Sequence, residues 1–312
     1  PKNKNINAPE FQFEITLIHT TNDSEYEVKY GFSFTWRLKK EISVGVKNEY
    51  LLIKENSKKQ KFSYYIKREN GELVGKYKAS EFGRCDKKIN IKSNELIINK
   101  LYAYDSLFYA DIIEEINDFD IYIDRHLDSS NAFDLEPIIH KDIDDLKLVT
   151  ADNIPRTLFK LHENYKEKYE YLIDIYKQLF PRIEDIRIRQ FKLSGEISED
   201  MIPDISKISD EYQIVDYLYM IFCKEYNMST EINFQEMSDG ARRILLLLTN
   251  LILADINNIS LFCIEEPENS INPSLFRNYI EIINDLSDKT KIIITSHSPY
   301  LIDYLSPEQI YI

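Results

Sequence analysis

The stretch Leu261–Glu268 (LFCIEEPE) constrains the fold of this chain most, because four apolar residues run directly into two adjacent carboxylates and a proline. Four apolar residues without alternation are typical of a strand covered on both faces, which favours a parallel sheet. α/β proteins bind ligands at the carboxyl ends of such strands, so we expect Glu265 and Glu266 to meet solvent, metal or substrate there. A merely charged strand end is the alternative.

The residues that follow complete a strand–helix–strand unit. Apolar residues recur at helical spacing over Ser274–Leu286, and Lys291–Thr295 (KIIIT) reads as a second buried strand. Such a unit pairs its two strands in parallel. His297, just past the second strand, is therefore expected at the same sheet edge as Glu265 and Glu266.

Two adjacent carboxylates at a strand end can divide a reaction between them. Neighbouring side chains on a strand point to opposite sides of it, so Glu265 and Glu266 diverge. One carboxylate can then face a magnesium ion while the other faces an attacking water, which suits nucleotide hydrolysis.

A deeply buried helix is predicted after Ser238, which is a good N-cap, because the helix is apolar on nearly all sides, from Ile244 to Leu248 and again from Leu251 to Leu253. Gly240 lies in the first turn of this helix and costs about 1 kcal/mol relative to alanine. Close approach of a phosphate to the free amides of the helix N-terminus would compensate for that cost. A simple capped core helix is the alternative.

Three segments in order carry a family resemblance: MSDGARR at 237–243, LFCIEEPENSINP at 261–273 and IIITSHSP at 292–299. They closely resemble the C-terminal half of ABC-type ATPase heads, in the branch of RecF, SMC and OLD-like proteins and of the AAA ATPase domains of bacterial anti-phage defence proteins. The resemblance implies an α/β fold with an antiparallel β lobe, a helical lobe and a mainly parallel core sheet. It also implies ATP and Mg²⁺ as cofactors.

The resemblance further implies a role for each site residue. In this family the signature motif contacts the γ-phosphate held by an opposing subunit, and Ser238, Asp239 and Gly240 correspond to it. The remaining roles fall to Glu265 at the magnesium position of Walker B, Glu266 as general base or water-orienting residue, Asn269 in the D-loop, and His297 as the switch histidine that senses γ-phosphate. Two residues depart from the family pattern: glutamate replaces the commoner aspartate at 265, and Asn272 stands where many relatives have histidine.

One family motif is missing from the 312 residues, because no G-x-x-x-x-G-K-[ST] occurs among the seven glycines. The nearest stretch, Gly71–Tyr77, is better explained by a hairpin turn at Asn70-Gly71. We expect the P-loop upstream of Pro1. A subunit that has lost ATP binding is the alternative.

Three segments are expected along the chain. Residues 1–104 form a β-rich lobe that opens with a hairpin of Phe11–Leu17 and Tyr26–Phe34. Residues 105–235 form a mainly helical lobe, and residues 236–312 form the core with the motifs. Within the second segment the sequence predicts a long helix from Pro155 to the residue before Pro181, a strand at Arg182–Lys192 and a helix at Tyr212–Tyr226.

Composition limits the partners. A formal net charge of −14 argues against broad electrostatic binding to nucleic acid or to anionic membranes. A local contact between DNA and the strand that carries Arg187, Arg189 and Lys192 stays open. No apolar run approaches the length of a membrane span, and the three cysteines show no metal spacing, so we expect a cytoplasmic protein.

The resemblance leads us to expect an enzyme that hydrolyses Mg-ATP as a conformational switch. It would act as a homodimer or higher homo-oligomer, with ATP sandwiched between heads. The compact heads without coiled-coil arms suggest a bacterial defence ATPase that controls a nuclease or toxin effector, which is family analogy. Two alternatives are a degenerate head that holds a protein partner without turnover, and a DNA-repair head that binds duplex DNA.

Overall fold

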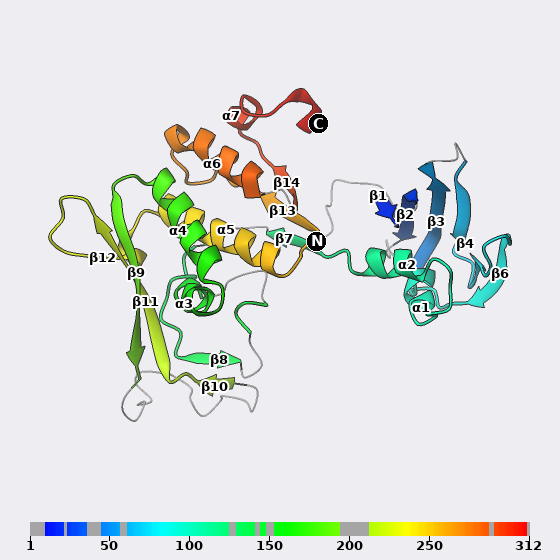
Figure 1. Ribbon diagram of the computed structural model, residues 1–312, viewed down its shortest axis with the longest axis horizontal. Helices are drawn as coiled ribbons and strands as arrows, with labels where there is room; N and C mark the ends of the chain where they lie inside the picture. The colour runs from blue at the N-terminus through cyan, green and yellow to red at the C-terminus, as the bar shows by residue number, and fades with distance from the viewer. Residues whose placement is uncertain are drawn as a thin grey trace, which may run out of the picture. The chain divides into compact units, whose positions relative to one another are not determined.

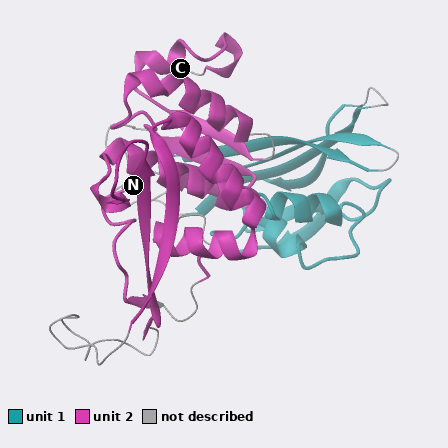
Figure 2. Ribbon diagram, turned by 60° about the vertical axis from the view of Figure 1, so that its left-hand side comes forward, with its two compact units in different colours: residues 1–119 teal, residues 120–312 magenta. Residues whose placement is uncertain are grey.

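The computed structural model describes residues 10–21, 24–35, 45–56, 61–124, 129–140, 144–147, 153–193, 212–286 and 290–310. The chain forms two compact units, residues 1–119 and residues 120–312 (Figure 2). Residues 105–119 therefore belong to the first unit, and residues 120–235 share a unit with the core that follows them.

Unit 1 is a six-stranded antiparallel sheet in which each strand pairs with the next along the chain (Figure 1). Its strands are β1 (Glu10–Thr20), β2 (Glu25–Thr35), β3 (Gly45–Glu55), β4 (Ser63–Arg68), β5 (Val74–Lys78) and β6 (Cys85–Asn90). The β1–β2 register pairs Phe13 with Phe32 and Leu17 with Val28, which confirms the predicted hairpin. Asn70 and Gly71 between β4 and β5 have φ of 53° and 71°, which confirms the predicted turn.

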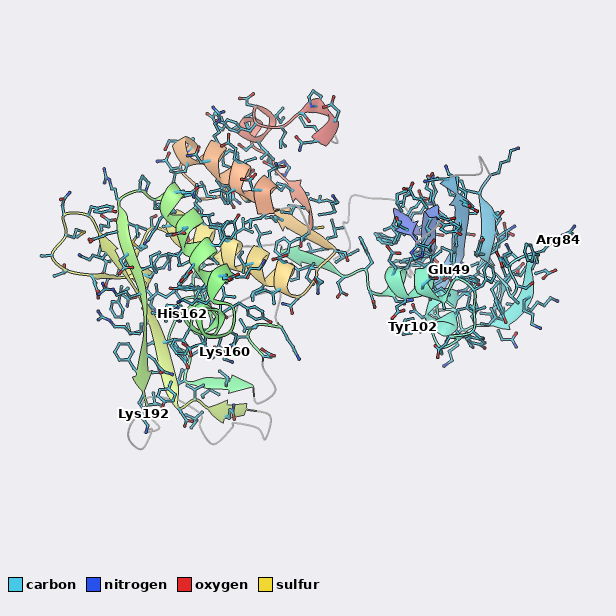
Figure 3. All side chains as sticks on the ribbon, viewed as in Figure 1. Glu49, Arg84, Tyr102, Lys160, His162 and Lys192 are labelled. Carbon is cyan, nitrogen blue, oxygen red and sulfur yellow. The ribbon has the colours of Figure 1, made fainter. Side chains whose placement is uncertain are left out.

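Two short helices cover one face of this sheet, α1 (Ile97–Leu101) and α2 (Ala110–Asn117), around a core that includes Leu51 and Ile66. The buried carboxylate of Glu49 on β3 accepts hydrogen bonds from the backbone N–H groups of Ile97 (2.6 Å) and Ile98 (2.9 Å), at the start of α1 (Figure 3). It thus satisfies amides that a helix leaves unpaired at its first turn. Burial raises the pKa of Glu49.

Unit 2 contains the parallel sheet that the motif strands predicted. Its strand order is β14 (Lys291–Thr295), β13 (Leu261–Glu265), β7 (Ile121–Asp124), all parallel. Helix α6 (Pro273–Leu286) connects β13 to β14, and the expected strand–helix–strand unit is confirmed. Ser238 is the N-cap of helix α5 (Asp239–Ile256), as predicted.

The expectation that β13 is covered on both faces is wrong for the described residues of unit 2. Phe262 and Ile264 are buried in a core with residues of α5 and α6, whereas Leu261 and Cys263 on the other face are only half-buried. The difference arises because this core lies against one face of the sheet.

The remainder of unit 2 is mixed in structure. Its elements are β8 (Ile138–His140), α3 (Ile154–Asn164), α4 (Lys166–Leu179), β9 (Ile183–Lys192), β10 (Tyr212–Ile214), β11 (Tyr217–Glu225), β12 (Ile232–Asn233), α7 (Pro299–Ile302) and single 3-10 turns at Phe234–Glu236 and Pro307–Gln309. Strand β9 confirms the strand predicted at Arg182–Lys192, and Lys192 stands at its end (Figure 3). No helix in the described ranges is both long and apolar enough to cross a membrane.

Two predictions in this region are corrected. The helix predicted before Pro181 is divided at Tyr165, whose φ of −138° lies outside the helical range, so α3 and α4 are separate helices. The helix predicted at Tyr212–Tyr226 is wrong, because this segment forms β10 and β11. β11 pairs antiparallel with β9, and its β-branched and aromatic residues suit that pleated surface.

Candidate functional site

The carboxyl ends of β13 and β14 lie side by side. Glu265 pairs in register with Thr295, and the N–H of Glu266 donates to the carbonyl of Thr295 at 2.8 Å. The structure therefore brings Glu265, Glu266 and His297 to one sheet edge, where the sequence placed them.

Glu266 occupies an unusual backbone position at this edge. Its φ is +48°, a left-handed conformation that non-glycine residues adopt at a cost of about 1–3 kcal/mol. Its Oε2 accepts a hydrogen bond from Asn269 Nδ2 at 2.7 Å, and its Oε1 lies 3.7 Å from Nε2 of His297. The side chain of Glu266 is 37% exposed and that of His297 is 93% exposed. A carboxylate held by an amide, beside an imidazole and open to solvent, can orient a water and accept its proton.

Glu265 is the last residue of β13 and is exposed. Because side chains alternate along a strand, Glu265 lies on the same face of the sheet as Cys263, opposite the buried Phe262 and Ile264. Its carboxylate therefore points away from the core. Mg²⁺ bound together with a nucleotide takes only one or two protein carboxylates in addition to phosphate oxygens and water. An exposed carboxylate next to Glu266 fits that requirement.

The turn after β13 leads into helix α6. Ser270 in this turn has a φ of +65°. Asn272 caps the helix, because its Oδ1 accepts from the N–H and the hydroxyl of Ser274, both at 3.0 Å. Asn272, which departs from the family pattern, thus has a local structural role as a helix cap.

The N-terminus of α5 adjoins this turn. Ser238 caps the helix through its Oγ, which accepts from the N–H of Ala241 at 3.3 Å. A Cβ added to Gly240 would lie 2.2 Å from the carbonyl oxygen of Ser270. Contact with protein backbone is therefore one reason for a glycine at 240, and the approach of a phosphate suggested by the sequence stays a prediction.

Asp239 is engaged within the chain. Its carboxylate accepts from the hydroxyl of Ser129 at 2.6 Å. Hydrogen bonds from Ser129 and then Ser270, together with the charges of Arg243 and Arg242, lower the pKa of Asp239. The side chain of Asp239 thus connects the start of α5 to two loops.

Sequence reasoning missed several residues at this site. Arg242 and Arg243 follow the signature-like residues on α5, and Ser296 donates to Glu268 Oε1 at 2.5 Å across the two strand ends. The sequence carried a signal for the arginines, which are a charged pair at the start of an otherwise apolar helix. Ser129 bonds to Asp239 across 110 positions of the sequence and Ser296 bonds to Glu268 across 28, and no sequence pattern indicates either pair.

Arg187 and Arg189, which the sequence analysis considered as possible contacts to DNA, already form ion pairs with carboxylates of the same unit. Arg187 contacts Asp185 at 2.7 Å and Glu231 at 3.3 Å, and Arg189 also contacts Glu231. The guanidinium of Arg189 lies over the ring of Phe222 at 4.5 Å. These contacts favour a solvated strand face over a site for DNA phosphates.

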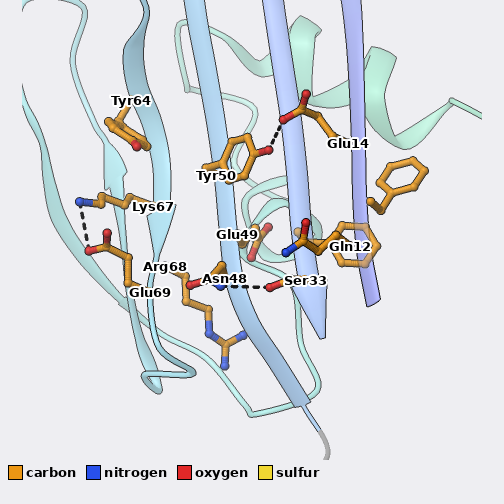
Figure 4. Close-up of a pocket in the computed structure, with 12 residues that line it drawn as sticks. Gln12, Glu14, Ser33, Asn48, Glu49, Tyr50, Tyr64, Lys67, Arg68 and Glu69 are labelled. Atoms are coloured by element: carbon orange, nitrogen blue, oxygen red, sulfur yellow. Dashed lines mark hydrogen bonds and ion pairs between the residues drawn. The ribbon is translucent and has the colours of Figure 1, made fainter. Parts of the chain in front are cut away.

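A cavity of about 540 Å³ lies on the sheet of unit 1, in a different unit from the paired strand ends (Figure 4). Its polar side chains bond one another: Tyr50 donates to Glu14, Asn48 donates to Ser33 and Lys67 pairs with Glu69. Burial and the bond to Glu14 raise the pKa of Tyr50 to about 12. We therefore place the candidate site at the strand ends of unit 2.

The comparisons with known proteins identify the family of the chain. A family model described as "AAA domain, putative AbiEii toxin, Type IV TA system" matches residues 8–303. No curated protein matches the chain significantly.

Several solved structures are similar at low identity. An SMC head domain from Thermotoga maritima is 10% identical and is matched over 91% of this chain and 68% of that chain, with a TM-score of 0.33. An SMC head bound to the C-terminal winged-helix domain of ScpA is 10% identical over 89% and 68%, with a TM-score of 0.39. A Pyrococcus furiosus SMC head bound to the C-terminal domain of ScpA is 10% identical over 89% and 72%, with a TM-score of 0.34.

The family model spans nearly the whole chain, including α5, the turn after β13 and His297. It confirms the AAA-type ATPase domain that the three sequence segments indicated. The chain belongs to the AAA-domain family whose description names a putative AbiEii toxin of a type IV toxin–antitoxin system.

Proposed function

We propose that this protein binds Mg-ATP between two heads and hydrolyses it, and that hydrolysis acts as a conformational switch. The observation that carries the proposal is the environment of Glu266. Its carboxylate is held by Asn269 at 2.7 Å, stands 3.7 Å from His297 and projects from a sheet edge where ligands bind in α/β folds.

Each residue at the edge has a distinct proposed role. Glu266 orients the attacking water and takes its proton, while Asn269 fixes the carboxylate through Oε2. His297 reaches the γ-phosphate, since its ring is almost fully exposed. Glu265 holds the magnesium ion, which neutralises charge on the phosphates when it is bound.

The start of α5 is proposed to face the phosphates held by a second head. Backbone amides at a helix N-terminus favour an anion, and Arg242 and Arg243 add positive charge in the same turn. Ser238 and the amide of Gly240 are the groups that would touch the γ-phosphate. Asp239, which the resemblance also places in the signature motif, would hold the segment in position through Ser129.

A switch requires that ATP and its products bind the two states differently. Contacts from His297 and from the start of α5 to the γ-phosphate exist only before hydrolysis, so loss of that phosphate would release the paired heads. The family description names a toxin, and we propose that the head controls a nuclease or toxin effector in bacterial anti-phage defence. The proposal also needs a P-loop, which these 312 residues do not contain.

The proposal is tested by measuring the mass of the natural-length protein in solution with and without Mg-ATP. The Glu266→Gln variant keeps the shape of the side chain but cannot act as a base, so we expect it to accumulate as an ATP-bound dimer. Wild type should dimerise only while ATP lasts. A matched variant, Glu308→Ala, alters an exposed glutamate outside the site and should behave as wild type. If neither wild type nor Glu266→Gln binds ATP, the proposal fails and a partner-holding scaffold takes its place.

A further inference from the structure

A hydrogen-bonded pair connects the two turns that carry the candidate catalytic groups. The hydroxyl of Ser296, just past β14, donates to Oε1 of Glu268, just past β13, at 2.5 Å. The same hydroxyl oxygen accepts from the N–H of Ser298 at 2.9 Å. Ser296 therefore fixes its own turn and attaches it to the neighbouring one.

His297 lies between the two serines of this arrangement. Its side chain is 93% exposed, so packing does not determine where the ring points. The position of the ring depends instead on the backbone of residues 296–298, which the Ser298 N–H to Ser296 Oγ bond holds in place. This turn thus sets where the backbone of His297 lies relative to Glu266, whose Oε1 is 3.7 Å from the His297 ring.

The turn on the other side also needs support. Glu266 and Ser270 both have positive φ, and such conformations persist only where surrounding contacts fix them. Two hydrogen bonds within the turn contribute, from Asn269 N–H to the Glu266 carbonyl at 3.2 Å and from Ile271 N–H to the Glu268 carbonyl at 3.1 Å. The side chain of Glu268 adds a bond from this turn to the strand next to it.

Only one oxygen of Glu268 is used. Oε2 is buried and has no hydrogen-bond partner among the residues that the structure describes. The contact with Ser296 needs an acceptor at Oε1 and does not need the negative charge. Glu266 differs, because its proposed role as a base requires the charged carboxylate.

We infer that Glu268 and Ser296 are positioning residues, which together set His297 against Glu266 for hydrolysis. This inference rests on the proposed function, because only that function gives Glu266 and His297 their roles. The pair touches neither the nucleotide nor the water. It acts by keeping the two strand-end turns in register.

The kinetic test uses Glu268→Ala, Ser296→Ala, the double variant and the conservative Glu268→Gln, all in the natural-length protein. Misplaced catalytic groups lower kcat, so each alanine variant should lose about tenfold in kcat while KM for ATP stays within about twofold. Residues that act through one contact are not additive, so the double variant should be no slower than the slower single variant. Glu268→Gln keeps the acceptor and should stay within about threefold of wild type in kcat.

A second measurement does not depend on turnover. The imidazole signals of the histidines, five of which lie in these 312 residues, can be recorded by NMR, with that of His297 assigned by its absence in His297→Asn. The His297 signal should shift in Ser296→Ala and Glu268→Ala and stay unchanged in Glu268→Gln. The signals of the other histidines should not move in any of these variants, which would show that each variant folds.

The outcomes separate this inference from the proposed function. A shifted His297 signal in a protein without ATP turnover would reject the function and keep the pair as a positioning contact. An unchanged His297 signal in both alanine variants would overturn the inference, whatever the turnover. Additive losses in the double variant would also overturn it, because the two residues would then act independently.

Discussion

The carbonyl oxygen of Ser270 lies 2.2 Å from the point where a Cβ on Gly240 would stand. The start of α5 and the turn after β13 therefore touch through backbone. Asp239 reinforces this contact, since a hydrogen bond from Ser270 helps to lower its pKa. Through Asn269, the same turn also holds the carboxylate of Glu266. A displacement of the start of α5 should therefore also displace the turn after β13, and the reverse should hold.

Gly240→Ala should abolish turnover. Helix propensity alone would make alanine at this position about 1 kcal/mol more favourable, but its Cβ cannot fit beside the Ser270 carbonyl without moving the turn. Steady-state ATPase assays and thermal unfolding on the same samples should show a loss of activity larger than any loss of stability. The control is Gly83→Ala, where the nearest atom is the hydroxyl at the movable end of the Ser80 side chain. Wild-type activity in Gly240→Ala would show that the turn is free to move.

Tyr176→Phe should lower the stability of unit 2 by about 1 kcal/mol. The fully buried hydroxyl of Tyr176 on α4 donates to the carbonyl of Ala241 at 3.1 Å, in the first turn of α5. Its removal leaves a buried carbonyl with one partner fewer. Urea unfolding measures the change, and Tyr171→Phe, on the exposed side of the same helix, is the matched control. Equal effects of the two substitutions would contradict this account.

Asp145→Asn should destabilise the protein by about 1–3 kcal/mol at pH 7, because it removes the more buried of the two carboxylates, Asp145 and Glu136, that pair with the buried Arg156. The side chain of Asp145 is 2% exposed and contacts Arg156 at 2.8 Å and Lys160 at 2.6 Å. Lys160 is labelled in Figure 3. The neighbouring exposed Asp144→Asn should change stability by about 0.5 kcal/mol at most. Chemical unfolding of both variants gives the comparison.

The same network predicts a pH dependence. Burial would raise the pKa of Asp145, but hydrogen bonds and charges from Arg156 and Lys160 outweigh burial and hold that pKa below its ordinary value. A carboxyl whose pKa is lower in the folded state stabilises the fold above its unfolded pKa. The stability difference between wild type and Asp145→Asn should therefore be constant from pH 7 to about 5 and shrink below about pH 4. A difference that grows on acidification would contradict the assignment.

The core of the site was predictable because its signals are local. An apolar run ending in Glu265 and Glu266, a helical period and a second apolar run are sufficient to place His297 at the same edge, since a strand–helix–strand unit fixes the direction of both strands. The N-cap at Ser238 is likewise a local feature.

The rest depended on contacts that no local pattern encodes. The apolar residues of Tyr217–Glu225 suit a helix or a strand, and pairing with β9 decides for the strand. The positive φ of Glu266 and Ser270 is set by the surrounding loops. Without that backbone, neither the bond from Ser296 to Glu268 nor the contact of Gly240 with Ser270 can be inferred.

The most direct measurement is single-turnover hydrolysis of Mg-ATP by the natural-length protein and by Glu266→Gln, with ATP affinity determined on the same samples. If Glu266 is the base, the variant should bind ATP as tightly as wild type and lose at least about a hundredfold in the rate of hydrolysis, since general base catalysis typically contributes that much. Hydrolysis at the wild-type rate in a variant that binds ATP normally would remove Glu266 from the catalytic role and contradict the account.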